Sequence, residues 1–194
     1  MKIKRYLLLL ILFLFGFFVF KYLNKASPDV KSASVFSRFL VKVEDPASDI
    51  SEILLIATGD VLPARSVNSQ ATRKDDFIWA FENIKELLAS GDVTLINLET
   101  PLIENCPVTD EGMIFCGSQR HIDGLNASGI DVVNVANNHM GNWGIDGVNQ
   151  TKKMLEENNI LVCGSSTGNI VYKNIKGVKF AFLGYNDIGT QAGV

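Results

Sequence analysis

The sequence predicts a layered α/β fold with a largely parallel core sheet. Short apolar runs alternate with helical patterns along the chain, as in folds built from strand–helix units. Several of these runs are apolar throughout, which is typical of strands covered on both faces. Three of them end in polar side chains followed by turns. With 194 residues and 47% hydrophobic content, the chain is long enough for about one domain.

The first two strands are expected at Ile53–Ala57 and Val93–Ile96, where the apolar runs are continuous. Between them, Asp76 is expected to cap a helix at Phe77–Ala89, whose apolar residues recur on one face. A polar segment at Leu102–His121 follows the second strand.

The second half of the domain repeats the pattern and closes with a hairpin. Its expected elements, in order, are a helix at Ile122–Ser128, a strand at Val132–Ala136, a helix at Gly147–Asn158, a strand at Ile160–Cys163, and hairpin arms at Ile170–Ile175 and Val178–Leu183.

The N-terminal segment is basic and then apolar. Residues 1–25 hold five basic residues and no acid, and Tyr6–Phe20 is apolar without interruption. We interpret 1–25 as an uncleaved single-pass membrane anchor with its amino terminus inside; a cleaved export signal is the alternative. Residues 26–50 then form a linker, with a short ordered stretch at Val35–Val43, and residues 51–194 form the domain. Both interpretations place this domain outside the cytoplasm.

Charge and cysteine content bound the function further. Removing the five basic residues of the anchor from the total of 18 leaves 13 against 21 acidic residues, the opposite of a nucleic-acid binder. In an oxidising compartment, Cys106 and Cys116 can form a disulfide within one turn-rich segment. Cys163 lies in an apolar run and is expected to be buried.

Polar side chains follow three of the expected strands. Because carboxyl ends of parallel strands meet at one edge of a sheet, these side chains can converge there. Carboxylate, amide and imidazole groups suit a divalent cation, namely Mn²⁺, Zn²⁺, Fe or Mg²⁺. The residues at the three strand ends are Asp60, Asn97, Glu99, Asn137, Asn138 and His139.

Roles can be assigned within this set. His139 can protonate a leaving group, and the planar guanidinium of Arg65 can bind a phosphate or carboxylate. Arg65, Asn97 and Asn137 are the candidate substrate-binding residues. Taken singly, each site residue is equally well explained as a turn, a helix cap or a surface ion pair; three strand ends with the same composition favour a site.

Three segments carry a family resemblance: Thr58–Arg65, Ile96–Leu102 and Ala136–Gly144. They resemble the successive motifs of the bacterial capsule-synthesis family of the CapA type, associated with poly-γ-glutamate biosynthesis and related to the calcineurin-like metallophosphoesterases. The resemblance implies a layered metallophosphoesterase-like fold. It also implies that Asp60, Glu99 and Asn138 are metal ligands and that His139 is the catalytic acid or a phosphate-binding residue.

The chain departs from the family pattern in two ways. Asn142 stands where the family commonly has an acid. Phosphoesterases of this type also use later histidines, whereas this chain has only His121 and His139, and His121 lies in the polar segment away from the motifs. We therefore expect the fold to be truncated at its C-terminal end.

Two functions follow from these observations. The first is a membrane-anchored extracytoplasmic protein of capsule or poly-γ-glutamate biosynthesis with a metal-dependent hydrolase site. The alternative is a non-catalytic component that binds the polymer or membrane synthase subunits. The expected partners are an anionic polymer such as poly-γ-glutamate or capsule material, the membrane and those subunits, with no nucleic acid. A nucleotide-binding fold is excluded because no glycine-rich phosphate loop follows the first strand.

Overall fold

The computed structural model describes residues 39–41, 52–165 and 169–188. The expected anchor at 1–25 lies outside these ranges, as does the expected linker at 26–50 apart from residues 39–41. Within the described ranges, no helix combines the length and the apolar character needed to cross a bilayer.

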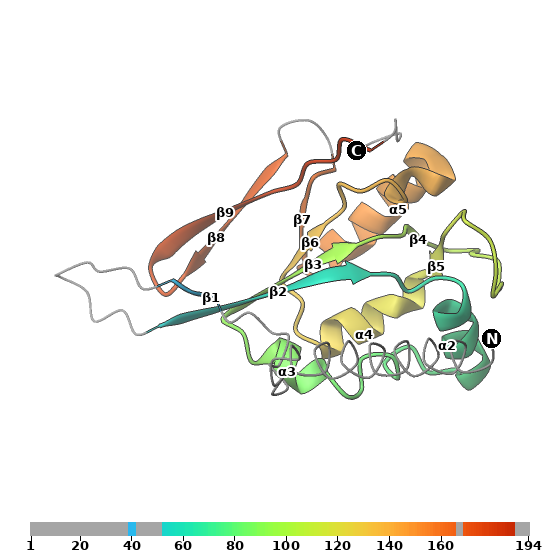
Figure 1. Ribbon diagram of the computed structural model, residues 1–194, viewed down its shortest axis with the longest axis horizontal. Coiled ribbons are helices and arrows are strands. Elements are labelled where there is room, and N and C mark those ends of the chain that lie inside the picture. Colours follow the sequence, from blue (N-terminus) through green and yellow to red (C-terminus); the bar gives the residue numbers. More distant parts are fainter. Residues whose placement is uncertain (1–38, 42–51, 166–168, 189–194) are drawn as a thin grey trace, which may run out of the picture. The chain divides into compact units, whose positions relative to one another are not determined.

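A five-stranded sheet organises the domain, in the order β1-β2-β3-β6-β7 (Figure 1). The β2–β3, β3–β6 and β6–β7 pairs are parallel, which confirms the predicted α/β fold with a parallel sheet. Only β1, which lies within the stretch expected to be ordered in the linker, runs antiparallel to its neighbour. The strands are β1 (Phe39–Val41), β2 (Ile53–Val61), β3 (Val93–Leu98), β6 (Val132–Asn134) and β7 (Leu161–Cys163).

Helices pack on one face of this sheet. Residues from alternate strand positions, such as Ile96 and Val133, share a core with helical residues such as Leu88, Leu125 and Leu155. The helices are α2 (Ser66–Lys74), α3 (Lys85–Ala89), α4 (Ile122–Ala127) and α5 (Gly144–Glu157).

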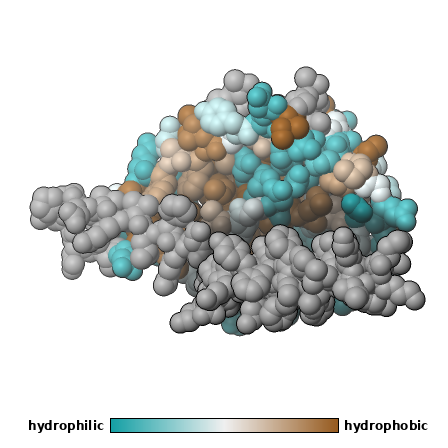
Figure 2. Space-filling view, viewed as in Figure 1, coloured by the Kyte–Doolittle hydropathy of each residue, from teal (hydrophilic) through white to brown (hydrophobic). Residues whose placement is uncertain are grey.

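The hairpin of β8 (Ile170–Ile175) and β9 (Val178–Leu183) covers the other face, and both arms have the bounds predicted from the sequence (Figure 1). Ile175 and Phe182 enter a second core with residues on the opposite side of the strands from the helices. Two lysines attach the hairpin: Lys173 pairs with Asp131 at 2.9 Å and Lys176 with Asp92 at 2.8 Å. Figure 2 shows hydrophobic and hydrophilic residues interspersed on this side of the domain. Ile170, Tyr172 and Leu183 of the hairpin are exposed.

The helix predicted at Phe77–Ala89 is wrong over its first eight residues. Asp76 accepts the main-chain N–H groups of Ile78 and Trp79, as an N-cap would. Tight turns with i→i+3 hydrogen bonds follow, and α-helix begins only at Lys85. These turns let Phe77 and Phe81 both point into the core, with Phe77 packed edge-on against the His121 ring at 4.9 Å.

One helix was not predicted. α2 follows the first strand, but the buried residues on its inner face are Asn68, Ser69 and Ala71, so no apolar stripe marks it in the sequence. Packing at the end of β2, and not hydrophobic periodicity, determines this element.

The segment expected to be polar and turn-rich is built from short elements. It contains β4 (Leu102–Ile103), β5 (Gly117–Ser118) and the 3₁₀-helix η1 (Gln119–His121). Cys106 and Cys116 form the expected disulfide, with their Cα atoms 5.8 Å apart, and Cys163 is a buried free cysteine as expected. The disulfide therefore closes the loop between β4 and β5, and β5 begins directly after Cys116.

Candidate functional site

A β-bulge in β2 brings Asp60 opposite Asn97 on β3. The register with β3 shifts between Ala57 and Asp60, where β2 carries one residue more than β3. A bulge of this kind reorients the side chains that follow it. As a result Asp60 pairs with Asn97, whose Nδ2 donates to Asp60 Oδ1 at 2.6 Å.

Asn97 is the centre of an amide network across three strand ends. Its Oδ1 accepts a hydrogen bond from Asn134 at 2.8 Å and one from Asn137 at 3.2 Å. Asn134, the register partner of Asn97 on β6, was missed in the sequence because it lies inside an otherwise apolar strand. Its position is tightly enclosed: a Cβ on Gly164 or Gly184 would collide with Asn134 Oδ1.

Asn137 organises the turn after β6. It is 7% exposed, and its Oδ1 accepts the main-chain N–H groups of His139 and Met140. Its Nδ2 donates to Leu98 O at 2.9 Å as well as to Asn97. These contacts use both donors and both acceptor positions of the amide. Asn137 therefore holds the loop that carries His139, and substrate binding by its side chain stays a prediction.

Glu99 lies beside Asp60 and is half-buried. Its main-chain N–H donates to Val61 O at 3.0 Å, which anchors the residue to the end of β2. Burial raises the pKa of the Glu99 carboxyl; a hydrogen bond to Asp60 and repulsion by the Asp60 charge raise it further, while the charge of His139 opposes these effects. Two carboxylates and the imidazole thus lie within electrostatic reach of one another, as the sequence predicted.

Two neighbouring side chains, Asn142 and Phe115, hold the His139 ring in place. Its Nδ1 lies 3.1 Å from Asn142 Oδ1, and its ring packs against the ring of Phe115 with centroids 4.2 Å apart. The guanidinium of Arg65 lies 6.0 Å from the centroid of the same Phe115 ring. Phe115 was missed in the sequence, because nothing marks one apolar residue in a polar loop.

Arg65 has an unusual backbone conformation. Its φ of 52° lies in the left-handed region, and it precedes α2 as the N-cap. A non-glycine residue in this region costs about 1 kcal/mol or more, and such strain concentrates at functional sites. Arg65 and His139 both lie beside the ring of Phe115.

Asn138 is partly exposed, and its side chain makes no hydrogen bond to another described residue. The predicted ligands Asp60, Glu99 and Asn138 thus supply two carboxylates and one amide oxygen. Within the described ranges, no three His, Cys, Asp or Glu side chains are grouped so as to hold a metal ion. The donor chemistry fits part of a Mg²⁺ or Mn²⁺ coordination sphere.

The sequence model of the family described as "Bacterial capsule synthesis protein PGA_cap" matches residues 54–193. The chain belongs to this family. The match includes all seven predicted site residues and both arms of the hairpin.

Relatives of the capsule-synthesis family agree with this assignment. The chain is 27% identical over 146 residues to the capsule biosynthesis protein CapA of Bacillus anthracis, a match covering 70% of this chain and 35% of that protein. It is 24% identical over 156 residues to the PGA biosynthesis protein CapA of Bacillus subtilis (strain 168), covering 76% and 40%. An uncharacterized protein, y4sH of Sinorhizobium fredii, is 29% identical over 57% of this chain. The matches to the two CapA proteins thus span only 35–40% of the length of those relatives.

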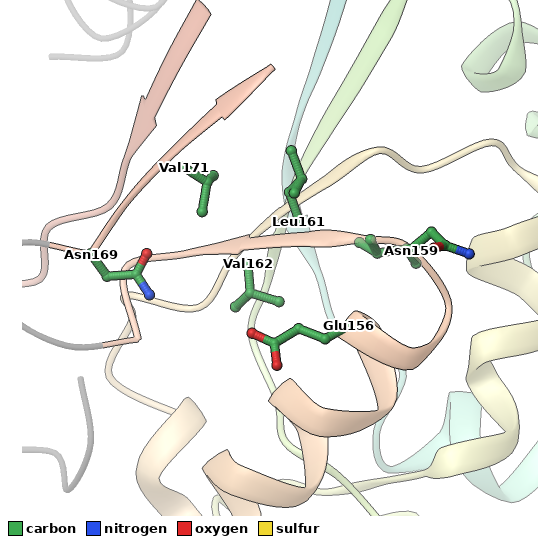
Figure 3. Close-up of a pocket in the computed structure, with 7 residues that line it drawn as sticks. Glu156, Asn159, Leu161, Val162, Asn169 and Val171 are labelled. Carbon is green, nitrogen blue, oxygen red and sulfur yellow. The ribbon is translucent and has the colours of Figure 1, made fainter. Parts of the chain in front are cut away.

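A pocket of about 350 Å³ lies elsewhere, at the edge strand β7 (Figure 3). Val162 and Val171 line it together with Glu156 from the end of α5 and Asn169, which precedes β8. None of the seven predicted site residues contributes to it. This pocket is therefore separate from the candidate site at the strand ends.

Proposed function

We propose that this capsule-synthesis protein carries a metal-dependent hydrolase site of phosphoesterase type at the ends of β2, β3 and β6. The observation that carries the proposal is that Asp60 and Glu99 meet at the paired ends of β2 and β3, where the Glu99 N–H bonds Val61 O and Asp60 faces Asn97. Burial and then the nearby Asp60 carboxyl raise the pKa of Glu99 there. Two neighbouring carboxylates repel each other, and a bound divalent cation would offset that repulsion.

Asp60, Glu99 and Asn138 would hold the cation, with water or further protein groups completing its coordination. Bound there, a cation would polarise a substrate oxygen and lower the pKa of a coordinated water. Asn97 orients Asp60 through the 2.6 Å hydrogen bond, so the carboxylate presents its other oxygen to the site.

The remaining residues act on the substrate. His139 is proposed to give a proton to the leaving oxygen, because Asn142 and Phe115 hold its ring and it lies within electrostatic reach of Glu99. Arg65 is proposed to bind an anionic group of the substrate with its guanidinium. We propose an anionic polymer such as poly-γ-glutamate or capsule material as this substrate, since two relatives are named for capsule and PGA biosynthesis.

The proposed location is the outer face of the cell membrane, with a single-pass anchor at 1–25 and membrane synthase subunits as partners. The Cys106–Cys116 disulfide supports it, because disulfides persist in oxidising compartments. Protease added to intact cells should degrade the domain and leave a cytoplasmic control protein whole. A domain protected until the membrane is breached would contradict this location.

Metal content tests the hydrolase site. The purified chain in detergent, loaded with Mn²⁺ and passed through a desalting column, should retain metal by elemental analysis. Asp60→Asn should lose it, because the substitution removes the charge and keeps the shape. Asp123→Asn is the matched control, since Asp123 is exposed on α4 and is not among the proposed ligands. Equal metal in all three proteins, or none in the wild type, would reject the proposed site.

A second function is favoured by the ligand set. Because two carboxylates and an amide are an incomplete metal shell, the site can instead serve a non-catalytic component that binds the polymer or the synthase. His139→Ala in the producing cell separates the two functions. Lost polymer output with normal protein abundance favours the hydrolase, and unchanged output favours the binding component.

A further inference from the structure

One oxygen, Oδ1 of Asn142, lies between a main-chain donor and the His139 ring. Phe115 N donates to it at 2.8 Å, and His139 Nδ1 lies 3.1 Å from it. A main-chain N–H can only donate, so the Asn142 atom that faces it is the carbonyl oxygen and not the amide nitrogen. The main chain of Phe115 therefore fixes the orientation of the Asn142 amide.

A carbonyl oxygen can only accept a hydrogen bond, so the His139 nitrogen beside it must be the protonated one. We propose that Asn142 is a positioning residue that keeps neutral His139 in the Nδ1–H tautomer and leaves the lone pair on Nε2. Nε2 is then the nitrogen that takes and gives a proton at the strand ends. The tautomer follows from these contacts alone, whereas the use of Nε2 in proton transfer rests on the proposed function, in which His139 is the acid.

Phe115 supports the same geometry from the side. Its ring packs against His139 with an interplanar angle of 36°, so it limits rotation of the imidazole about its Cβ–Cγ bond. Phe115 is 5% exposed and is followed directly by Cys116, whose disulfide ties this end of the loop to Cys106. The loop thus supplies both the donor that orients Asn142 and the surface on which His139 rests.

The other histidine provides an internal reference. His121 Nε2 lies 3.1 Å from Asn68 Oδ1, an oxygen that also accepts Ser118 N at 2.9 Å. By the same reasoning, Nε2 of His121 carries the proton. Its Nδ1 is buried and has no partner among the described residues. The chain has two histidines in all, and the geometry assigns them opposite tautomers.

Nitrogen-15 NMR tests this directly. The full chain is labelled with nitrogen-15 at histidine and studied without metal, in detergent, at about pH 8. This pH is above the ordinary imidazole pKa of about 6.5. Long-range proton–nitrogen correlations then distinguish protonated from unprotonated ring nitrogens. We expect one Nδ1–H and one Nε2–H imidazole, with His139→Gln removing the Nδ1–H set. An Nε2–H signal for His139 in the wild type would overturn the inference.

Variants test whether Asn142 is the cause. Asn142→Leu keeps a similar volume and removes the acceptor, so the His139 signals should move toward the Nε2–H form that free imidazole side chains prefer in water. Asn142→Asp keeps an acceptor oxygen and should restore Nδ1–H. Asn126→Leu, on the exposed side of α4, should change neither histidine.

The outcomes separate this inference from the proposed function. Retention of Nδ1–H at His139 in Asn142→Leu would overturn the role of Asn142. The His121 signals report folding in each variant, and the wild-type and Asn142→Asp spectra decide the question if Asn142→Leu does not fold. Because no metal is present, a failed metal-binding test would reject the hydrolase site and leave the tautomer result standing.

Discussion

Asn97 donates its side-chain N–H to the Asp60 carboxylate at 2.6 Å, across the parallel pairing of β3 with β2. The same amide accepts hydrogen bonds from Asn134 and Asn137 through its oxygen. One side chain therefore connects the ends of three consecutive parallel strands. The order of the candidate site depends on this amide more than on any single carboxylate.

Asn97→Ala should lower the free energy of unfolding by about 2–4 kcal/mol, because it leaves three polar partners without Asn97 and each such loss costs about 1 kcal/mol or more. Urea unfolding followed by circular dichroism measures the change. The matched control is Asn126→Ala, which loses a single exposed hydrogen bond to Asn158 and should cost less than about 1 kcal/mol. Equal losses in the two variants would contradict a central role for Asn97.

Gly184→Ala tests the enclosure of Asn134. A Cβ at Gly184 would overlap Asn134 Oδ1, and the main chain of Gly164 lies at 3.0 Å on another side. The added methyl group should force Asn134 from its hydrogen bond with Asn97 and cost about 1–3 kcal/mol, as overpacking does. The melting temperature should fall accordingly.

Gly59→Ala is the control for this glycine substitution. An added Cβ there meets no atom within 4 Å, so its melting temperature should stay close to that of the wild type. A Gly184→Ala protein as stable as Gly59→Ala would show that Asn134 has room to move.

The sequence predicted the parallel strands and the polar strand ends well, because both depend on local signals. Continuous apolar runs mark β2 and β3, and turn residues bound the hairpin at Lys176-Gly177. Parallel geometry then brings the ends of β2 and β3, with Asp60 and Glu99, to one edge, although the bulge that sets the register of Asp60 is not marked in the sequence. These features need no knowledge of distant contacts.

Other parts of the site depend on contacts between segments far apart in the chain. Asn134 gains its role from its register with Asn97, 37 residues earlier. Asn142 gains its role from Phe115, which lies in a loop closed by a disulfide. α2 forms without an apolar stripe, and the turns before α3 replace a predicted helix. Local pattern cannot show any of these, because the deciding partner is elsewhere.

The disulfide should stabilise the chain by constraining its unfolded state. Cys106 and Cys116 are separated by 10 residues, and closing a loop of this size contributes about 2–3 kcal/mol. A reductant should therefore lower the melting temperature of the wild type. The Cys106→Ser/Cys116→Ser protein, which keeps only Cys163, should melt at the reduced value, and the reductant should not change its melting temperature. A wild-type melting temperature that the reductant leaves unchanged would contradict a stabilising disulfide.

Acid should destabilise the fold through His121. Burial lowers the pKa of His121 to about 4, against about 6.5 in the unfolded chain. Between these values the unfolded state binds a proton that the folded state does not, so stability present above about pH 6.5 is lost as the pH falls toward about 4. The loss amounts to about 3 kcal/mol in all. His121→Gln keeps a donor toward Asn68 and cannot titrate, so its free energy of unfolding should fall less over this interval, measured by urea unfolding at a series of pH values. Parallel curves for the two proteins would assign the acid sensitivity to carboxylates instead.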